Sequence, residues 1–210
     1  MERRNCSTGC GSMAAWIEKI TSIVKDHMAP LQGSVHSFDH VQRVYAIATF
    51  LAKEEKADLE LVQMSALLHD VGRALGEPHN ETGAKRTDEI LTDLQYPPEK
   101  RDKIVRIVLH HPLRFKGTLQ SLEEQIIWDA DKLDLLGVIG VARVFHFYGA
   151  LNRSFDGAVK YCHDQLRSIP NFMHTPTAKN LAERRHREAM SFLSALDKEL
   201  AVTTESVRWP

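Results

Sequence analysis

The sequence has few cysteines, no excess of charge of either sign and no long apolar run. Its three cysteines are Cys6, Cys10 and Cys162, an odd number with irregular spacing, so they do not form a disulfide framework. Cys6 and Cys10 are further apart than the cysteines of the common CxxC zinc knuckle, and no second pair follows. We therefore expect neither a disulfide-stapled domain nor a thiolate metal site, and a reducing, cytoplasmic location.

The charge of the chain is nearly balanced. Lys and Arg total 27, Asp and Glu total 28, and the formal net charge is -1 at pH 7. Proteins that bind duplex nucleic acid or an anionic membrane surface usually carry a basic patch. We therefore expect no duplex nucleic acid partner and no membrane partner. A small anionic substrate is compatible with this balance, because basic residues can cluster locally in a neutral chain.

No apolar run approaches the roughly 20 residues that a membrane-spanning helix needs. Residues 1–12 are polar and contain glycine, without the apolar core of a secretory signal, so we expect them to be disordered. The chain has 210 residues, of which 43% are hydrophobic, which suits one globular domain with a sizeable core.

Apolar residues recur at helical spacing along almost the whole chain. Ser37, Asp58 and Thr175 are candidate N-caps, and Pro176 suits the first position of the last helix. Convincing strands are absent, so we predict an all-α fold, a single helical bundle. The predicted helices cover about residues 16–24, 38–51, 59–71, 81–94, 99–109, 122–147 with a break near Gly137, 156–168 and 176–200.

Histidine is abundant, with 11 residues, and one of them forms the pair His69-Asp70 directly after the apolar residues Leu67 and Leu68. Two ionisable groups at the end of an apolar helix are costly to bury unless they find partners. A bound cation would satisfy both side chains. For an isolated pair, a hydrogen bond between the two side chains at the surface would be the better explanation.

Two further residues join this pair in the sequence pattern. His40 lies beside the inward face of an amphipathic helix, and Asp131 interrupts an apolar segment together with Asp129 and Asp134. Alone, His40 reads as a buried histidine and Asp131 as a helix cap. Together they give the order His, then His-Asp, then Asp, each on a different helix.

In this order and with their flanking residues, these motifs resemble the HD superfamily of metal-dependent phosphohydrolases, in particular its bacterial stand-alone members. The resemblance spans about residues 36–196 and implies one HD domain over residues 13–205, with a metal site between its helices. The resemblance implies that the metal ligands are His40, His69, Asp70 and Asp131. The matching strings are His40–Val44, Leu67–Arg73, Asp129–Gly137, Gly140–Arg143, Thr175, Arg185-His186 and Phe192-Leu193.

Two imidazoles and two carboxylates form a mixed set of nitrogen and oxygen ligands. Such a set is suited to Mn, Fe, Co, Ni or Mg and differs from the thiolate ligands of a typical zinc site. Such an ion activates water and polarises a phosphorus centre. We therefore expect divalent-metal-dependent hydrolysis of a phosphoester or phosphoanhydride. The family resemblance points to a nucleotide substrate, cleaved by a phosphatase or a pyrophosphohydrolase. A homodimer is compatible with the sequence.

Other histidines extend the candidate site. In several HD subfamilies, histidines at the chain positions of His79 and of His110 or His111 bind a second metal ion. If the site holds one ion, these residues become substrate contacts. Close relatives often have His-Asp-x-x-His at the first ligand, whereas this chain keeps His36 one turn upstream of His40 without that Asp. His36 is therefore either a substrate contact or a loop histidine.

Basic residues near the motifs are candidate phosphate contacts. Arg43 lies one turn after His40, Lys132 follows Asp131, and Arg114 lies in the loop after the two adjacent histidines. We predict Asp70, Arg43, Lys132 and Asp134 as catalytic residues. Asp134 would orient a ligand, accept a proton or form a salt bridge.

Two alternatives to the hydrolase follow from the same residues. A di-iron HD-fold oxygenase would use the additional histidines, and a non-catalytic HD module would use the pocket to sense a nucleotide.

Overall fold

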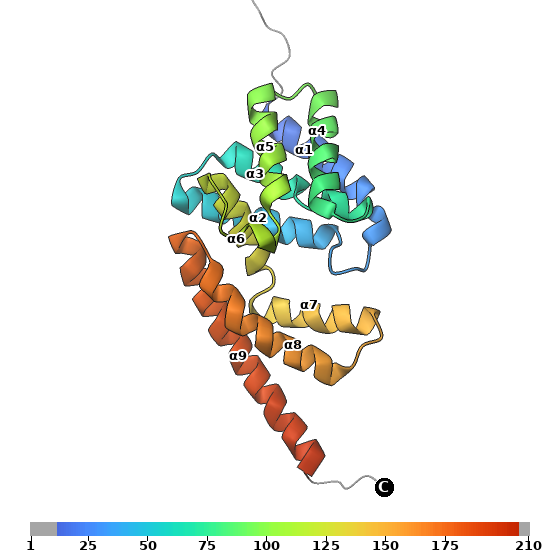
Figure 1. The fold of residues 1–210 in the computed structure, drawn as a ribbon, viewed down its shortest axis with the longest axis vertical. Coiled ribbons are helices and arrows are strands. Elements are labelled where there is room, and N and C mark those ends of the chain that lie inside the picture. The colour runs from blue at the N-terminus through green and yellow to red at the C-terminus, as the bar shows by residue number, and fades with distance from the viewer. Residues whose placement is uncertain (1–11, 206–210) are drawn as a thin grey trace, which may run out of the picture.

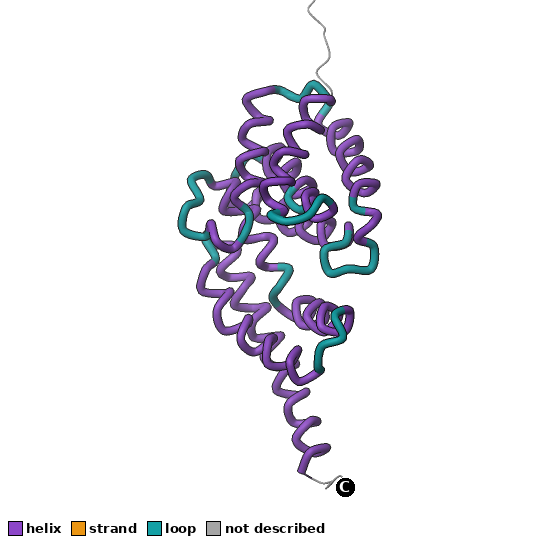
Figure 2. Tube along the Cα trace, turned by 45° about the vertical axis from the view of Figure 1, so that its right-hand side comes forward, coloured by secondary structure: helices purple, strands orange, loops and turns teal. Residues whose placement is uncertain are grey.

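The computed structural model describes residues 12–205, and within them it contains helices and loops but no strand (Figure 2). The all-α prediction is therefore confirmed. The α-helices are α1 (Met13–His27), α2 (Phe38–Glu55), α3 (Leu59–Leu68), α4 (His79–Asp93), α5 (Pro98–His110), α6 (Leu122–Leu133), α7 (Gly137–Ala150), α8 (Phe155–Ser168) and α9 (Pro176–Glu205).

Helix starts follow the local sequence. The side chain of Asp58 accepts a hydrogen bond from the backbone N–H of Leu61, and the hydroxyl of Thr175 accepts one from Ala178. Ser37 occupies the N-cap position of α2 but makes no such bond. Ser12 is the N-cap of α1. Cys6 and Cys10, like the other residues before Ser12, lie outside the described part of the chain.

The predicted break near Gly137 separates α6 from α7. Gly137 has φ of +75°, a left-handed conformation that a residue without a Cβ adopts at little cost. The axes of the two helices differ by 66°. Among the described residues no single helix is long and apolar enough to cross a membrane, and this bent pair meets that criterion only when its two helices are taken together.

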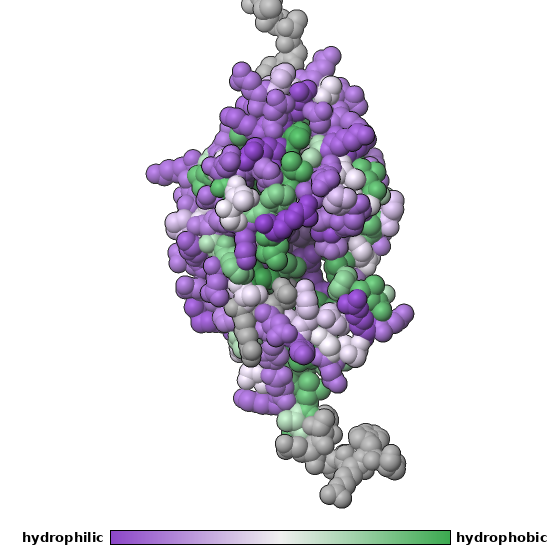
Figure 3. All heavy atoms as spheres, viewed as in Figure 1, coloured by the Kyte–Doolittle hydropathy of each residue, from purple (hydrophilic) through white to green (hydrophobic). Residues whose placement is uncertain are grey.

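The buried side chains form two apolar clusters. One is built mainly from α1, α3, α4 and α5, with Val41 of α2, and includes Ile20 and Leu68. The other is built mainly from α2 and α6 to α9, with a few residues of α3 and α5, and includes Trp128 and Leu193. Figure 1 shows α1 to α6 gathered at one end of the molecule and α7 to α9 at the other. Hydrophilic side chains cover most of the face in Figure 3.

Short 3-10 helices connect several α-helices and were not predicted. One, Val71–Ala74, follows the His69-Asp70 pair directly, and another, Leu113–Phe115, lies in the loop after α5. The 3-10 helix Val71–Ala74 helps to position the candidate site.

Candidate metal centre

Five buried side chains and one partly buried side chain meet where α2 to α6 converge. His40 belongs to α2, Asp131 to α6, and His79 begins α4. The other three lie directly after helices, His69 and Asp70 after α3 and His111 after α5. The five buried ones are His40, His69, Asp70, His111 and Asp131.

A glycine lets the chain bring His79 to the His69-Asp70 pair. A Cβ atom on Gly72 would lie 2.0 Å from the backbone oxygen of His79 and 2.4 Å from the backbone nitrogen of Gly83. The 3-10 turn after Asp70 therefore packs directly on the first turns of α4. Only a residue without a side chain allows this approach.

The four ligands implied by the family resemblance lie together. The Nε2 atom of His40 is 3.3 Å from that of His69 and 3.3 Å from Asp131 Oδ1. Asp70 Oδ2 is 3.6 Å from His40 Nε2 and 3.8 Å from His69 Nε2. His40, His69 and Asp131 thus form one group that could hold an ion, with Asp70 beside it.

A second group uses the other oxygen of Asp70. Asp70 Oδ1 lies 3.5 Å from His111 Nε2 and 3.9 Å from His79 Nε2, and these two nitrogens are 3.3 Å apart. Asp70, His79 and His111 could hold an ion of their own. The carboxylate of Asp70 therefore stands between the two groups, with one oxygen facing each.

The Nδ1 atoms of four histidines contact oxygen atoms, which directs their Nε2 atoms into the cluster. When Nδ1 donates a hydrogen bond, the neutral ring keeps its lone pair on Nε2. Lone pairs that face each other at 3.3 Å repel, and a cation between them removes this repulsion, so the residues fit divalent ions. The Nδ1 contacts are Asp134 Oδ2 for His40 (2.7 Å), the Ala66 carbonyl for His69 (2.8 Å), Glu77 Oε2 for His79 (3.0 Å) and the Val108 carbonyl for His111 (2.6 Å).

The ionisation of the cluster also suits a metal ion. Burial lowers the pKa of His69 to about 4, so its ring is neutral at pH 7. Burial works against ionisation of Asp70, but the facing His69 and His111 hold the pKa of this carboxyl well below its usual range. Burial likewise opposes a proton on His40, yet contacts with Asp131 and Asp134 raise its pKa. A metal ion would compete with that proton.

Asp134 contacts a ligand and two arginines. Its carboxylate accepts two hydrogen bonds from Arg43, of 2.8 and 3.1 Å, and one of 2.7 Å from Arg143. It contacts His40 Nδ1 at the same time. Arg43 is thus engaged by a buried carboxylate. Arg143 was quoted in the sequence pattern without a role, and the structure adds it to the site.

Two other cations lie against the ligand carboxylates. Lys132 contacts the carboxylate of Asp131 and lies 3.5 Å from the carbonyl of His111. Arg73 donates a 3.1 Å hydrogen bond to Asp70. The Nδ1 atom of His36 lies 3.5 Å from Asp70 Oδ2, and His36, His40 and Asp70 form a third group that could hold an ion.

The structure does not bring His110 and Arg114 into the cluster. His110 Nδ1 lies 3.0 Å from a carboxylate oxygen of Glu124, and Arg114 donates to the side chain of Asn80. Adjacent residues at a helix end point about 100° apart, and here His111 faces Asp70 whereas His110 faces Glu124. Glu77 was not predicted, because nothing in its sequence context marks it as a partner of His79.

Comparisons with known proteins identify the family of this chain. A family model described as "HD domain" matches residues 37–136. The Bacillus subtilis (strain 168) protein YpgQ, described as uncharacterized, is 32% identical over 180 residues, which are 80% of this chain and 86% of YpgQ. This chain belongs to the HD superfamily. HD domains bind divalent metal ions, and the two groups around Asp70 could hold them.

Solved structures resemble most of the chain. An HD-superfamily hydrolase from Bacillus thuringiensis is 31% identical, with a TM-score of 0.76, over 90% of this chain and 99% of that one. A Bacillus subtilis YpgQ structure in complex with ADP is 27% identical, with a TM-score of 0.73, over 87% of this chain and 97% of that one. These similarities support a metal-dependent hydrolase.

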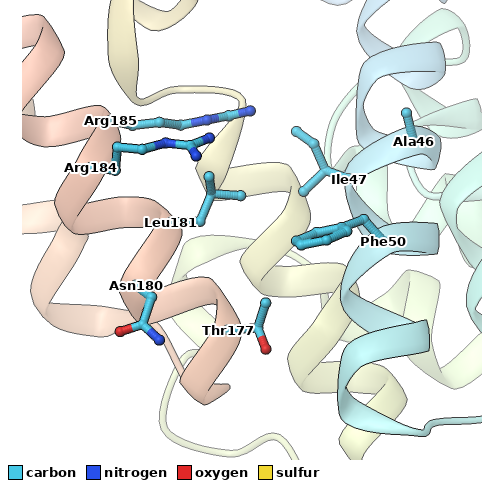
Figure 4. Close-up of a pocket in the computed structure, with 8 residues that line it drawn as sticks. All are labelled: Ala46, Ile47, Phe50, Thr177, Asn180, Leu181, Arg184 and Arg185. Carbon is cyan, nitrogen blue, oxygen red and sulfur yellow. The ribbon is translucent and has the colours of Figure 1, made fainter.

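A cavity of about 600 Å³ lies between α2 and α9 (Figure 4). None of the residues that line it belongs to the two groups around Asp70. They are Ala46, Ile47, Phe50, Thr177, Asn180, Leu181, Arg184 and Arg185.

Proposed function

We propose that this protein hydrolyses a phosphoester or phosphoanhydride bond of a nucleotide, with two divalent ions bound on either side of Asp70. The observation that carries the proposal is the position of Asp70 between two pairs of histidines. In each pair the Nε2 atoms are 3.3 Å apart. His40, His69 and Asp131 would hold one ion and His79 with His111 the other, with Asp70 contributing one oxygen to each.

When bound, the ions supply a Lewis acid for the phosphate and activate a water molecule. The protein supplies charge and orientation. Asp70 and Asp131 offset part of the charge of the ions, and Asp134 holds the ring of His40 through its Nδ1 atom. Asp134 also engages Arg43, so we assign Arg43 a positioning role. Arg73 and Lys132 lie at the ligand carboxylates, where their charges would attract phosphate oxygens.

A nucleotide is the favoured substrate because the similar protein YpgQ was crystallised with ADP. A nucleoside phosphate also matches the chemistry of the site. Its phosphates would bind to divalent ions and to the side chains of Arg73 and Lys132. Its base would need an apolar surface nearby. The products identify which bond is cut, since a phosphatase releases phosphate and a pyrophosphohydrolase releases pyrophosphate.

The test is a screen of nucleoside mono-, di- and triphosphates for release of phosphate and pyrophosphate, with and without added Mn²⁺. Bound metal is measured on the same protein, purified without added metal. We expect release from at least one nucleotide that depends on a divalent ion and is lost in His111→Ala. The matched control is His110→Ala, because this neighbouring histidine faces Glu124 instead of the cluster. Metal-loaded protein that releases neither product from any nucleotide would contradict the proposal.

A further inference from the structure

A second cavity, of about 210 Å³, opens beside the metal-binding side chains. Its walls come from the segment before α2, from the junction of α6 and α7, and from α7 and α8. Its lining includes His36, Leu135, Arg143, Val144, Phe147 and Tyr161.

This cavity shares two side chains with the surroundings of the metal-binding residues. His36 lines it, and the Nδ1 atom of His36 is 3.5 Å from Asp70 Oδ2. Arg143 also lines it and donates to Asp134, the carboxylate that contacts His40. A ligand with phosphates at Asp70 could therefore reach the cavity with its other end.

The wall of the cavity is tied together by hydrogen bonds. Arg143 donates to the carbonyl of Val35 at 2.8 Å, and His146 Nε2 lies 2.6 Å from the carbonyl of Gly33. These contacts hold the segment before α2 against α7. The side chain of Arg143 is 10% exposed, and its Nε atom is buried without a hydrogen-bond partner among the described residues.

The other side chains of the cavity are apolar or aromatic. Phe147 and Tyr161 are 38% and 40% exposed, whereas large apolar side chains are usually buried. The ring of Tyr161 packs against that of Tyr148, with 5.7 Å between their centroids, which limits its motion. Leu135 and Val144 complete the apolar lining. Exposed aromatic faces beside a polar site are suited to stacking a planar heterocycle.

We propose that this cavity binds the nucleoside part of the substrate, with its base against Phe147 and Tyr161 and its phosphates directed past His36 to Asp70. The inference rests on the proposed nucleotide substrate and names the side chains that select it. Phe147 and Tyr161 thereby determine affinity for the nucleoside and not for the phosphates.

The test is the Kd of ADP and of inorganic pyrophosphate, measured by calorimetry on the Mn²⁺-loaded full chain. Stacking on one aromatic side chain typically accounts for a change of roughly 5- to 150-fold in Kd when the side chain is truncated. We expect Phe147→Ala and Tyr161→Ala to weaken ADP binding within this range. Pyrophosphate binding and metal content should not change. The matched control is Phe50→Ala, an aromatic residue of similar exposure, 47%, in the separate cavity between α2 and α9.

Two failures would be distinguishable. If the native protein hydrolyses nucleotides but both cavity variants bind ADP as tightly as it does, the nucleoside assignment is wrong and the proposed function stands. Equal weakening of ADP and pyrophosphate would also overturn the assignment, because it would place these residues at the phosphates or show general disruption. If the native protein binds metal but neither binds ADP nor hydrolyses any nucleotide, the proposed function fails and this inference fails with it.

Discussion

Asp70 is the residue on which the two candidate ion positions depend. Its Oδ2 atom faces His40 and its Oδ1 atom faces His111, so both groups use one carboxylate. Asp70→Asn keeps the shape but removes a charge and one oxygen ligand. We expect it to impair both positions, whereas His79→Ala should remove only the second ion. Metal content per chain, measured after dialysis, distinguishes the two variants.

The same variants should differ in metal-linked stability. An ion at about 100 times its Kd stabilises the folded state by about 2.7 kcal/mol, and we expect Asp70→Asn to lose this increment in thermal unfolding. The control is Asp39→Asn, which changes an exposed carboxylate directly before His40. Full metal content in Asp70→Asn, or loss of both ions in His79→Ala, would contradict the shared role of Asp70.

The sequence predicted the site residues that belong to short motifs, but not the contacts that depend on how helices pack. The family motifs predicted His40, His69, Asp70 and Asp131, which the structure brings together from three different helical regions. The choice between His110 and His111 stayed open, because the sequence does not fix the rotation of a helix end. Arg143 was assigned no role, since its partners Val35 and Asp134 depend on how α7 packs against distant parts of the chain.

Helix α6 carries Asp131 and is followed directly by Asp134, and its first turn is fixed by a capping box. The side chain of Ser121 accepts from Glu124, whose carboxylate accepts from the backbone N–H groups of Ser121 and Gln120. The Glu124 side chain is 1% exposed and also contacts His110 and Arg106. The start of this helix therefore depends on a buried, ionised glutamate.

We expect Glu124→Gln to lower the free energy of unfolding by roughly 1–2 kcal/mol at pH 7. Burial opposes ionisation, but the N–H of Gln120 and the contact with His110 lower the pKa of Glu124 below its ordinary value of 4.5. Its charge therefore stabilises the folded state above that value, and this contribution is lost as the pH falls through the folded-state pKa.

Urea unfolding of both proteins at several pH values checks this. The difference between them should shrink as the pH falls below about 4.5, where the carboxylate of Glu124 begins to be protonated in the unfolded chain. Glu99→Gln, an exposed acid in the first turn of α5, should change stability by only a few tenths of a kcal/mol. A difference that is constant with pH would show that the charge is not responsible.

Helices were predictable where the signal lies within a few residues. Apolar spacing, the caps Asp58 and Thr175 and the break at Gly137 all predicted real features of the chain. The 3-10 turn after Asp70 was not predictable, because it results from the packing of Gly72 against His79 across a turn. That packing also explains why α4 begins at His79, two residues before the predicted position.

At the scale of the molecule, the candidate metal ligand His40 lies on a helix that contributes to both apolar clusters. Val41 of α2 belongs to the cluster with α1, α3, α4 and α5, and Val44 of the same helix belongs to the other cluster. Tyr45 contacts both. His40 thus stands on a helix that is held from two sides, which fixes the position of a ligand better than a loop would.

Two reaction classes are compatible with an HD fold that binds two ions, and the redox requirement separates them. Hydrolysis needs a Lewis acid and an activated water but no change of oxidation state at the metal. An oxygenase needs iron and dioxygen. We therefore expect nucleotide hydrolysis to proceed at the same rate under anaerobic conditions, and chelator-treated protein to recover activity with Mn²⁺ alone.

The measurement is phosphate or pyrophosphate release with parallel recording of oxygen consumption, on protein reloaded separately with Mn²⁺ and Fe²⁺. Either Mn²⁺ or Fe²⁺ should restore product release without oxygen uptake, because histidine and carboxylate ligands accept either metal. His79→Ala serves as the comparison. If hydrolysis needs an ion at each of the two positions, the variant loses most of its kcat. If an ion at the first position suffices, the variant keeps its kcat and its KM rises. Iron-dependent oxygen uptake without release of either product would contradict the hydrolase and favour a di-iron oxygenase, with the same side chains as ligands.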